Sequence, residues 1–494
     1  MELGLAVSGI FYTFIAKPAI MGIMIGRHRE MVLFNAVLNG DRSEFVAVYG
    51  RRRVGKTFLI RTAFEGRFTF QLFGVANTAT EQQLENFAIA LKKVKKKGKA
   101  LPIKSWFEAF DQLADFLEKT TTAKKVVFID ELPWLDTPNS GFIQALEYFW
   151  NSWASARKDI ILVVCGSAAS WMINKLINNK GGLHNRVTKR IKVLPFTLQE
   201  CEQLVQSRKT VLNRYQIIQL YMVFGGIPFY WDEVSKELSA EQNIQQICFG
   251  ENGLLRTEFT NLFGSLFSNA ERHIAIANAL AVKVKGLTRD EIIRGSGLPD
   301  GGSMTRLLTE MEENGFIRKY VPFEKKMRTS LYQLTDHYTL FYLRFIKTTG
   351  YFDENKWLNM LDKPTYRAWS GYAFEQVCLY HVQQLKHALG IAAVDINVSS
   401  WRSKTIENGA QVDLVIDRRD QVINLCEMKF SINPFLIDKK YDAVLRNKMA
   451  AFKKETGTRK SVFLTMVTTF GLQKNTYAAA LVQNDVDMNA LFHQ

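Results

Sequence analysis

Short apolar runs that alternate with amphipathic segments shape the first part of the chain. β-branched and aromatic residues dominate these runs, which predict buried strands at 45–49, 68–73, 125–130 and 160–165. Apolar residues at helical spacing predict helices between them, at 31–38, 81–97, 105–119 and 141–156. Strands that alternate with helices favour a parallel α/β sheet, in which ligands bind at the carboxyl ends of the strands.

The pattern changes in the second half, where helices at 198–205 and 213–223 follow one another without a strand. Between residues 275 and 334 we expect helices, a turn at 295–302, a helix at 303–314 and strands at 316–321 and 330–334. That order is typical of a winged helix-turn-helix. Beyond it, a helix at 366–389 and strands at 413–417, 422–430 and 461–467 predict a separate small α/β unit.

A glycine-rich loop with the spacing G-x-x-x-x-G-K-[ST] joins the first strand to the next helix. Its residues are Gly50, Arg51, Arg52, Arg53, Val54, Gly55, Lys56 and Thr57, and Phe58 follows in the helix. The two glycines allow a backbone path whose N–H groups point at phosphate oxygens, and the helix adds the positive end of its dipole. Lys56 then reaches the β- and γ-phosphates of ATP, and the Thr57 hydroxyl is a ligand of Mg²⁺.

Two acidic residues, Asp130 and Glu131, end the third strand. A carboxylate at this edge of a parallel sheet can hold Mg²⁺, and the next one can polarise the attacking water, so we expect ATP hydrolysis. Ser167 follows the fourth strand and is a further catalytic candidate, because its hydroxyl could contact the γ-phosphate or the water. A structural serine cap is the alternative for Ser167.

Charge and cysteine usage bear on the partner and the compartment. A count of 64 Lys and Arg against 48 Asp and Glu gives a net charge of +16, which favours nucleic acid, although a well-solvated surface gives the same sum. The five cysteines are scattered without a C-x-x-C pair, which favours a reducing cytoplasm. Lys17 and Pro18 interrupt the apolar residues 1–23, so we expect a lead-in there and no membrane helix or signal peptide.

These motifs resemble the AAA+ ATPases, in the prokaryotic, archaeal-type branch that is related to origin-recognition proteins and the STAND NTPases. The resemblance implies a core at 24–197 with a five-stranded sheet of order 5-1-4-3-2, followed by a helical lid at 198–262. Gly26 and Arg27 match the entry motif near the adenine, so they join the loop residues, Phe58 and Asp130 as expected ATP contacts. Arg186 matches an arginine finger, which would act in a neighbouring subunit of a homo-oligomer. A surface salt bridge is the alternative for Arg186.

The last unit, at 366–484, resembles the PD-(D/E)XK nuclease fold. Glu375 on the helix, Asp413 on one strand, and Glu427 and Lys429 on the next strand carry this resemblance. It implies that the three carboxylates bind Mg²⁺ and that Lys429 orients water or stabilises charge on the phosphate. Glu427 and Lys429 face the same side of a strand, so a cross-strand ion pair is the alternative.

The unit between lid and nuclease-like end is expected to be a winged helix at 263–347. Its wing carries Arg318, Lys319, Lys325, Lys326 and Arg328, which could contact DNA or pack between domains. As a whole, the chain resembles prokaryotic ATPases with a C-terminal nuclease-like domain. We therefore expect an ATPase that acts on DNA, with a nuclease-like end that ATP gates. The alternatives are a DNA-binding or signalling ATPase with an inactive last domain, and an ATP-operated protein-interaction switch without nucleic acid.

Overall fold

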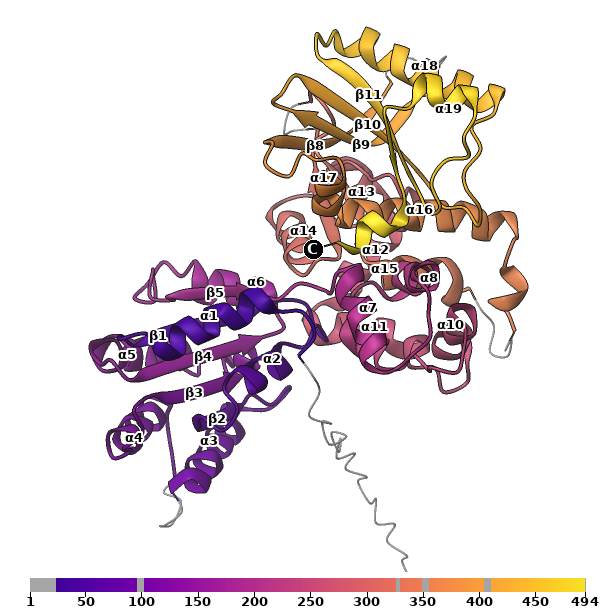
Figure 1. Cartoon of the computed structure of the whole chain (residues 1–494). Helices are drawn as coiled ribbons and strands as arrows, with labels where there is room; N and C mark the ends of the chain where they lie inside the picture. The colour runs from indigo at the N-terminus through magenta and orange to yellow at the C-terminus, as the bar shows by residue number, and fades with distance from the viewer. Residues whose placement is uncertain (1–23, 96–101, 326–328, 349–354, 404–409, 494) are drawn as a thin grey trace, which may run out of the picture.

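The computed structural model describes residues 24–95, 102–325, 329–348, 355–403 and 410–493. The expected lead-in at 1–23 and the wing residues Lys326 and Arg328 lie outside these ranges. Figure 1 shows an N-terminal α/β unit in indigo to magenta, a helical region beside it, and a second α/β unit in orange and yellow.

A five-stranded parallel sheet forms the centre of the N-terminal unit. Its order is β2-β3-β4-β1-β5, which confirms the expected order 5-1-4-3-2. The strands are β1 (Glu44–Tyr49), β2 (Phe68–Phe73), β3 (Lys125–Asp130), β4 (Ile160–Gly166) and β5 (Lys189–Lys192). Because all five strands run in one direction, the loops after β1, β3 and β4 meet at one edge of the sheet.

Helices cover both faces of this sheet, and alternate residues of each strand face opposite cores. In β1, Val46 and Val48 belong to one core, and Phe45 and Ala47 belong to the other. The first core takes residues from α1 (His28–Asn39) and α2 (Lys56–Ala63). The second takes residues from α3 (Thr80–Lys95), α4 (Trp106–Glu118) and α5 (Phe142–Ser152). The strands that carry the site are therefore held from both sides.

A group of helices follows β5 and packs against the first core. It consists of α7 (Leu198–Ser207), α8 (Arg214–Phe224), α9 (Pro228–Trp231), α10 (Ala240–Phe249) and α11 (Leu254–Leu266). Capping boxes start α7, α8 and α10. After α8 the backbone of Gly226 lies against Phe196, and a Cβ on Gly226 would lie 1.8 Å from the Phe196 carbonyl oxygen. Only glycine fits this contact between the N-terminal unit and the helices.

The middle unit contains three helices and an antiparallel hairpin in the expected order. These are α12 (Ala270–Val282), α13 (Arg289–Ser296), α14 (Gly302–Glu313), β6 (Ile317–Tyr320) and β7 (Leu331–Leu334), and α15 (His337–Phe341) follows them. The apolar face of α14 is buried through Met304, Leu307, Leu308 and Met311. The winged-helix assignment itself stays an interpretation.

The C-terminal unit has a five-stranded mixed sheet of order β12-β11-β10-β9-β8. The strands are β8 (Ile396–Arg402), β9 (Gln411–Arg418), β10 (Val422–Lys429), β11 (Ser461–Thr468) and β12 (Asn484–Val486). The main helices are α16 (Pro364–Tyr380), α17 (Val382–Ala388), α18 (Lys439–Thr456) and α19 (Thr476–Leu481), and the 3-10 helix η8 (Met488–Phe492) ends the unit. The nuclease-like assignment also stays an interpretation.

The expected single helix at 366–389 is interrupted at His381, between α16 and α17. The His381 ring is fully buried, and its Nδ1 donates to the Val377 carbonyl oxygen at 2.8 Å. Its Nε2 accepts from the Leu198 N–H at 3.0 Å, so it satisfies a free donor in the first turn of α7. The interruption therefore joins the C-terminal unit to the helical group.

A second joint lies at the start of α8. The Tyr215 ring stacks between Phe430 and Phe470, with ring centroids 5.1 and 5.3 Å away. The neighbouring Arg214 donates to Asn489 Oδ1 at 3.0 Å and lies 4.8 Å from the Phe492 ring centroid, both in η8. The last residues of the fold thus return to the helices that follow the first sheet.

All five cysteines are buried with free thiols. None of the described helices combines the length and the apolar character that crossing a membrane requires.

Candidate functional site

The glycine-rich loop lies between β1 and α2, where its two glycines hold positive φ angles. Gly50 has φ 144° and Gly55 has φ 86°. A Cβ on Gly50 would lie 2.3 Å from the Val193 carbonyl oxygen, so close packing against the chain after β5 requires glycine. Helix α2 begins directly after Gly55, and its first N–H groups and dipole favour an anion there.

Lys56 is buried inside this loop, with 5% of its surface exposed. Its Nζ donates to the carbonyl oxygens of Gly50 and Arg51 at 3.0 and 2.9 Å, and to Ser167 Oγ at 3.1 Å. These three acceptors are neutral oxygens. A buried ammonium among neutral acceptors favours an anionic ligand, and phosphate is the ligand that the surrounding loop fits.

Thr57 and Asp130 lie side by side, as the sequence predicts. Thr57 Oγ1 donates to Asp130 Oδ2 at 2.7 Å, and Asp130 Oδ1 accepts from the Glu131 N–H at 2.9 Å. A hydroxyl and a carboxylate are the hard oxygen ligands that Mg²⁺ prefers. The two residues therefore fit this metal.

Glu131 follows β3 in the left-handed region, with φ 47°. Its two carboxylate oxygens accept from Ser167, Oε1 from the hydroxyl at 2.8 Å and Oε2 from the N–H at 3.2 Å. Because Ser167 also accepts from Lys56, the three side chains form one hydrogen-bonded chain across the ends of β1, β3 and β4. A strained backbone is characteristic of residues that a functional site holds in place.

Gly26 and Arg27 connect the loop to helix α7. Arg27 Nη2 donates to the Val54 carbonyl oxygen at 3.1 Å, and the Arg27 N–H donates to Glu200 Oε1 at 3.4 Å. A Cβ on Gly26 would lie 2.0 Å from the same carboxylate oxygen. Contact of these residues with the adenine stays a prediction.

Two arginines of the loop contact the units beyond the first sheet. Arg51 pairs with Asp336, which caps α15, and both side chains are buried. Burial alone would raise the pKa of Asp336, but the Arg51 guanidinium and the hydrogen bonds from Thr339 together hold that pKa below its ordinary value. Arg53 Nη1 lies 2.7 Å from Glu258 Oε1 on α11. Contact of these arginines with ATP stays a prediction.

The remaining two ATP candidates and the arginine-finger candidate differ in exposure. Arg52 is half-buried and Phe58 is 42% exposed. Arg186 is exposed in the turn before β5, where the Thr188 N–H donates to the Phe45 carbonyl oxygen at the start of β1. It therefore lies at the amino edge of the sheet, away from the loop of its own chain. Its role as a finger, which stays a prediction, requires a neighbouring subunit.

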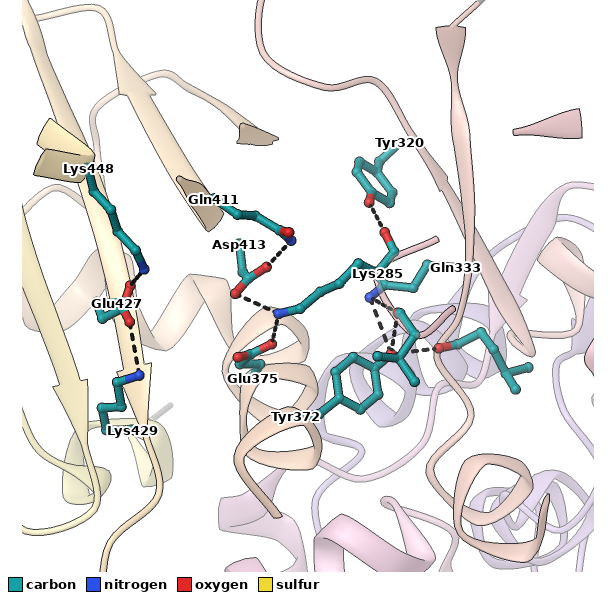
Figure 2. A network of polar contacts seen from close by, with 12 residues as sticks. Lys285, Tyr320, Gln333, Tyr372, Glu375, Gln411, Asp413, Glu427, Lys429 and Lys448 are labelled. Carbon is teal, nitrogen blue, oxygen red and sulfur yellow. Dashed lines mark hydrogen bonds and ion pairs between the residues drawn. The ribbon is translucent and has the colours of Figure 1, made fainter. Parts of the chain in front are cut away.

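Glu375 on α16 and Asp413 on β9 point toward one another, but Lys285 of the middle unit lies between them (Figure 2). Lys285 Nζ is 2.5 Å from Glu375 Oε2 and 2.7 Å from Asp413 Oδ2. Gln411 Nε2 donates to Asp413 Oδ1 at 2.8 Å. Burial and the neighbouring Asp413 raise the pKa of Glu375, and Lys285 opposes that shift.

Glu427 lies apart from this pair, between two lysines (Figure 2). Its carboxylate is 3.0 Å from Lys429 Nζ and 2.7 Å from Lys448 Nζ, and it accepts from the Tyr441 hydroxyl at 2.6 Å. Burial would raise the pKa of Glu427, but the two lysines lower it to about 2. Glu427 and Lys429 thus form an ion pair within β10, whereas the alternative to the nuclease motif expects a pair across strands.

The three carboxylates expected to bind metal are therefore not brought into one site. Within the described ranges, no group of three or more His, Cys, Asp or Glu side chains is placed to hold a metal ion. In this arrangement Glu375, Asp413 and Glu427 do not fit a metal.

Several residues that contact these sites were not predicted, and Asp336, Lys448 and Lys285 show why. Asp336 lies just after the second strand of the hairpin, and its position before a helix start was a signal for a cap. Lys448 is one of many basic residues on α18. Lys285 belongs to a loop whose sequence carries no motif, so only the fold reveals its contact with the two acids.

Comparison with known proteins supports the ATPase assignment of the N-terminal region. Residues 24–234 match the family model of an ATPase domain predominantly from Archaea. An uncharacterized protein of Methanocaldococcus jannaschii is 23% identical over 425 residues, which are 83% of this chain and 88% of that protein. The chain thus carries a P-loop ATPase domain of the archaeal type.

Solved structures that resemble this chain have lower sequence identity to it. The Walker-type ATPase of Pyrococcus abyssi has a TM-score of 0.48 at 16% identity, over 65% of this chain and 96% of that one. The ORC2 protein of Aeropyrum pernix has a TM-score of 0.40 at 14% identity, over 65% of this chain and 93% of that one.

Proposed function

We propose that this P-loop ATPase hydrolyses ATP to drive action on DNA, and that its C-terminal unit is a nuclease-type domain gated by ATP. The observation that carries the ATPase part is the hydrogen-bonded chain of Lys56, Ser167 and Glu131 beside Thr57 and Asp130. These groups come from separate elements and meet at the carboxyl edge of the sheet, where parallel α/β folds bind their ligands.

Each residue has one role in the proposed reaction. Lys56 exchanges its neutral acceptors for oxygens of the β- and γ-phosphates, and the loop N–H groups bind the remaining phosphate charge. Thr57 and Asp130 would hold Mg²⁺, and this ion would supply positive charge beside the phosphates. Glu131 accepts a proton from the attacking water, and Ser167 fixes the direction of its carboxylate.

Phosphate release from ATP tests the assignment of Glu131. Glu131→Gln should lower turnover by roughly 10²–10⁴-fold and leave ATP binding in place, because general-base catalysis is lost while the phosphate contacts remain. Lys56→Ala should lose both binding and turnover. Glu65→Gln, which changes an exposed acid beyond α2, is the matched control. Undiminished turnover in Glu131→Gln would contradict the proposed role.

DNA is the proposed second ligand because the chain carries a net charge of +16. Helix α18 adds a run of exposed basic side chains: Lys439, Lys440, Arg446, Lys453 and Lys454. Of the expected wing residues, Arg318 does not join this basic surface, because it turns inward and donates through Nε to Gln333 Oε1 at 2.8 Å. The ATPase is proposed to act in the cytoplasm as a homo-oligomer on this DNA.

Retention on DNA at stepped salt concentrations tests this part. Binding that neutralises phosphates should weaken steeply with salt, and the double variant Lys453→Glu, Lys454→Glu should reduce the slope. Retention that does not respond to salt or to this variant would favour the protein-interaction switch.

Cleavage of plasmid, linear and single-stranded DNA tests the C-terminal unit. The assay contains Mg²⁺ or Mn²⁺, with and without ATP, and compares the wild type with Lys429→Ala and Lys56→Ala. Cleavage that is lost in Lys429→Ala supports the nuclease, and its response to Lys56→Ala reports gating by ATP.

A second candidate function follows from the Lys285 contact. A DNA-binding or signalling ATPase with an inactive last domain would keep its acid pair paired with a lysine, as Glu375 and Asp413 are here. ATP turnover without cleavage on any of the DNA substrates, in the wild type and in Lys285→Met, would favour this candidate.

A further inference from the structure

The loop between α12 and α13 places Lys285 in the C-terminal unit. Its ammonium contacts Glu375 and Asp413, which come from a helix and a strand of that unit (Figure 2). The side chains of Lys285, Glu375 and Asp413 are 35%, 18% and 23% exposed. They line a cavity of about 150 Å³ between the middle and C-terminal units, which Arg318 and Tyr320 also line.

The backbone of this loop is held by both units. The Lys285 carbonyl oxygen accepts from the Tyr320 hydroxyl at 2.6 Å, and the Leu287 and Tyr332 backbones exchange hydrogen bonds of 2.9 and 2.8 Å. The Val284 carbonyl oxygen accepts from Gln333 Nε2 and from the Tyr372 hydroxyl, both at 2.8 Å. Tyr372 lies one helical turn before Glu375 on α16. The position of the ammonium therefore depends on how the middle unit sits against α16.

The net charge at this contact does not favour binding of a second cation. Two carboxylates and one ammonium sum to one negative charge, whereas two free carboxylates match a divalent ion. An ammonium donates three hydrogen bonds and accepts none, so it cannot be a metal ligand. The outer oxygen of Asp413 already accepts from Gln411. A divalent cation at this pair would meet the positive charge of Lys285 at contact distance.

We propose that Lys285 is an internal cation that closes the acid pair Glu375–Asp413, and that a divalent metal binds this pair only when the middle unit withdraws Lys285. The inference rests on the proposed nuclease-type function of the C-terminal unit and names how that site is regulated. In this proposal, the site is closed while the middle unit contacts the C-terminal unit through Lys285.

Mn²⁺ binding to the full chain without nucleotide tests the proposal, because free Mn²⁺ is measured directly by its electron paramagnetic resonance signal. Lys285→Met removes the ammonium and keeps the length of the side chain. This variant should bind one Mn²⁺ at least tenfold more tightly than the wild type. Asp413→Asn in the Lys285→Met background should abolish the gain.

Two further variants control for charge and for folding. Lys283→Met removes a lysine of the same loop that pairs with Glu291 at 2.8 Å, and it should bind Mn²⁺ like the wild type. Lys285→Gln keeps a hydrogen-bond donor without the charge, so it should show the gain even where Lys285→Met folds poorly. Circular dichroism of each variant reports folding.

The outcomes separate this inference from the nuclease proposal. Tight Mn²⁺ binding in Lys285→Met or Lys285→Gln without DNA cleavage supports the internal cation and removes the nuclease. Asp413-dependent Mn²⁺ binding in the wild type, unchanged in both Lys285 variants, overturns the internal cation and leaves the nuclease standing. Folded Lys285 variants that bind no Mn²⁺ overturn the internal cation as well.

Discussion

Removal of the Asp336 carboxylate is expected to destabilise the fold strongly, because Asp336 joins the phosphate loop to the middle unit. Arg51 and Asp336 are 6% and 4% exposed, and Asp336 also accepts from the N–H and the hydroxyl of Thr339 at 2.9 and 2.5 Å. Breaking a buried ion pair costs roughly 3–5 kcal/mol, and loss of a helix cap adds about 1 kcal/mol. Asp336→Ala should therefore lower the free energy of unfolding by about 4–6 kcal/mol.

Urea unfolding followed by tryptophan fluorescence measures this loss beside Arg51→Met and the double variant. The double variant leaves no uncompensated charge, so it should lose about 2 kcal/mol less than the two single losses added together. Asp395→Ala, which breaks an exposed pair with Arg419, should change stability by less than about 0.5 kcal/mol. If the losses of unfolding free energy from Arg51→Met and Asp336→Ala simply add in the double variant, the two residues are not a coupled ion pair.

Three further predictions concern a glycine, two histidines and the arginine-finger candidate. Gly226→Ala should lower the free energy of unfolding by about 1–3 kcal/mol or more, measured in urea, because its Cβ would meet the Phe196 carbonyl oxygen. Burial lowers the pKa of His337 and of His381 from 6.5 to about 4. As the pH falls, the unfolded chain therefore binds a proton at each histidine before the folded chain does. Stability should therefore fall between pH 6.5 and pH 4 by up to about 3 kcal/mol per histidine, and thermal unfolding should show a flatter pH profile in His381→Gln. Arg186→Ala should lower ATP turnover by roughly 10³-fold or more and remove any rise of specific activity with protein concentration, measured by phosphate release.

The sequence predicted the central strands well because they are buried on both faces. The expected bounds 125–130 coincide with β3, and 160–165 lie within one residue of β4, and both strands are buried along their whole length. The bounds 68–73 coincide with the edge strand β2, where the aromatic residues carry the signal. The strands that were not predicted, β5, β8 and β12, lie at sheet edges. An edge strand such as Lys189–Lys192 faces solvent and pairs on one side only, so it needs no apolar run.

The nucleotide site was largely readable for a similar reason. A phosphate loop and a strand that ends in two acids are local patterns, and the parallel sheet brings them together. The contacts of Lys285, Arg51 and Arg53 are between units instead. Charged residues in loops have many partners that are equally compatible with the sequence, and the packing of the units selects one. The break at His381 has the same origin, since its partner is the start of a helix far away in the chain.

The two joints attach the C-terminal unit firmly to the helical group. Tyr215 stacks between two aromatic rings, and the His381 ring accepts from the first turn of α7, so the C-terminal unit is fixed to these helices at two points. The same helices reach the nucleotide loop through Glu200 and Glu258. Glu375 lies on α16, the helix that ends at His381, so the acid pair is next to this joint. The nucleotide loop and the acid pair are thus connected through one continuous set of packed helices.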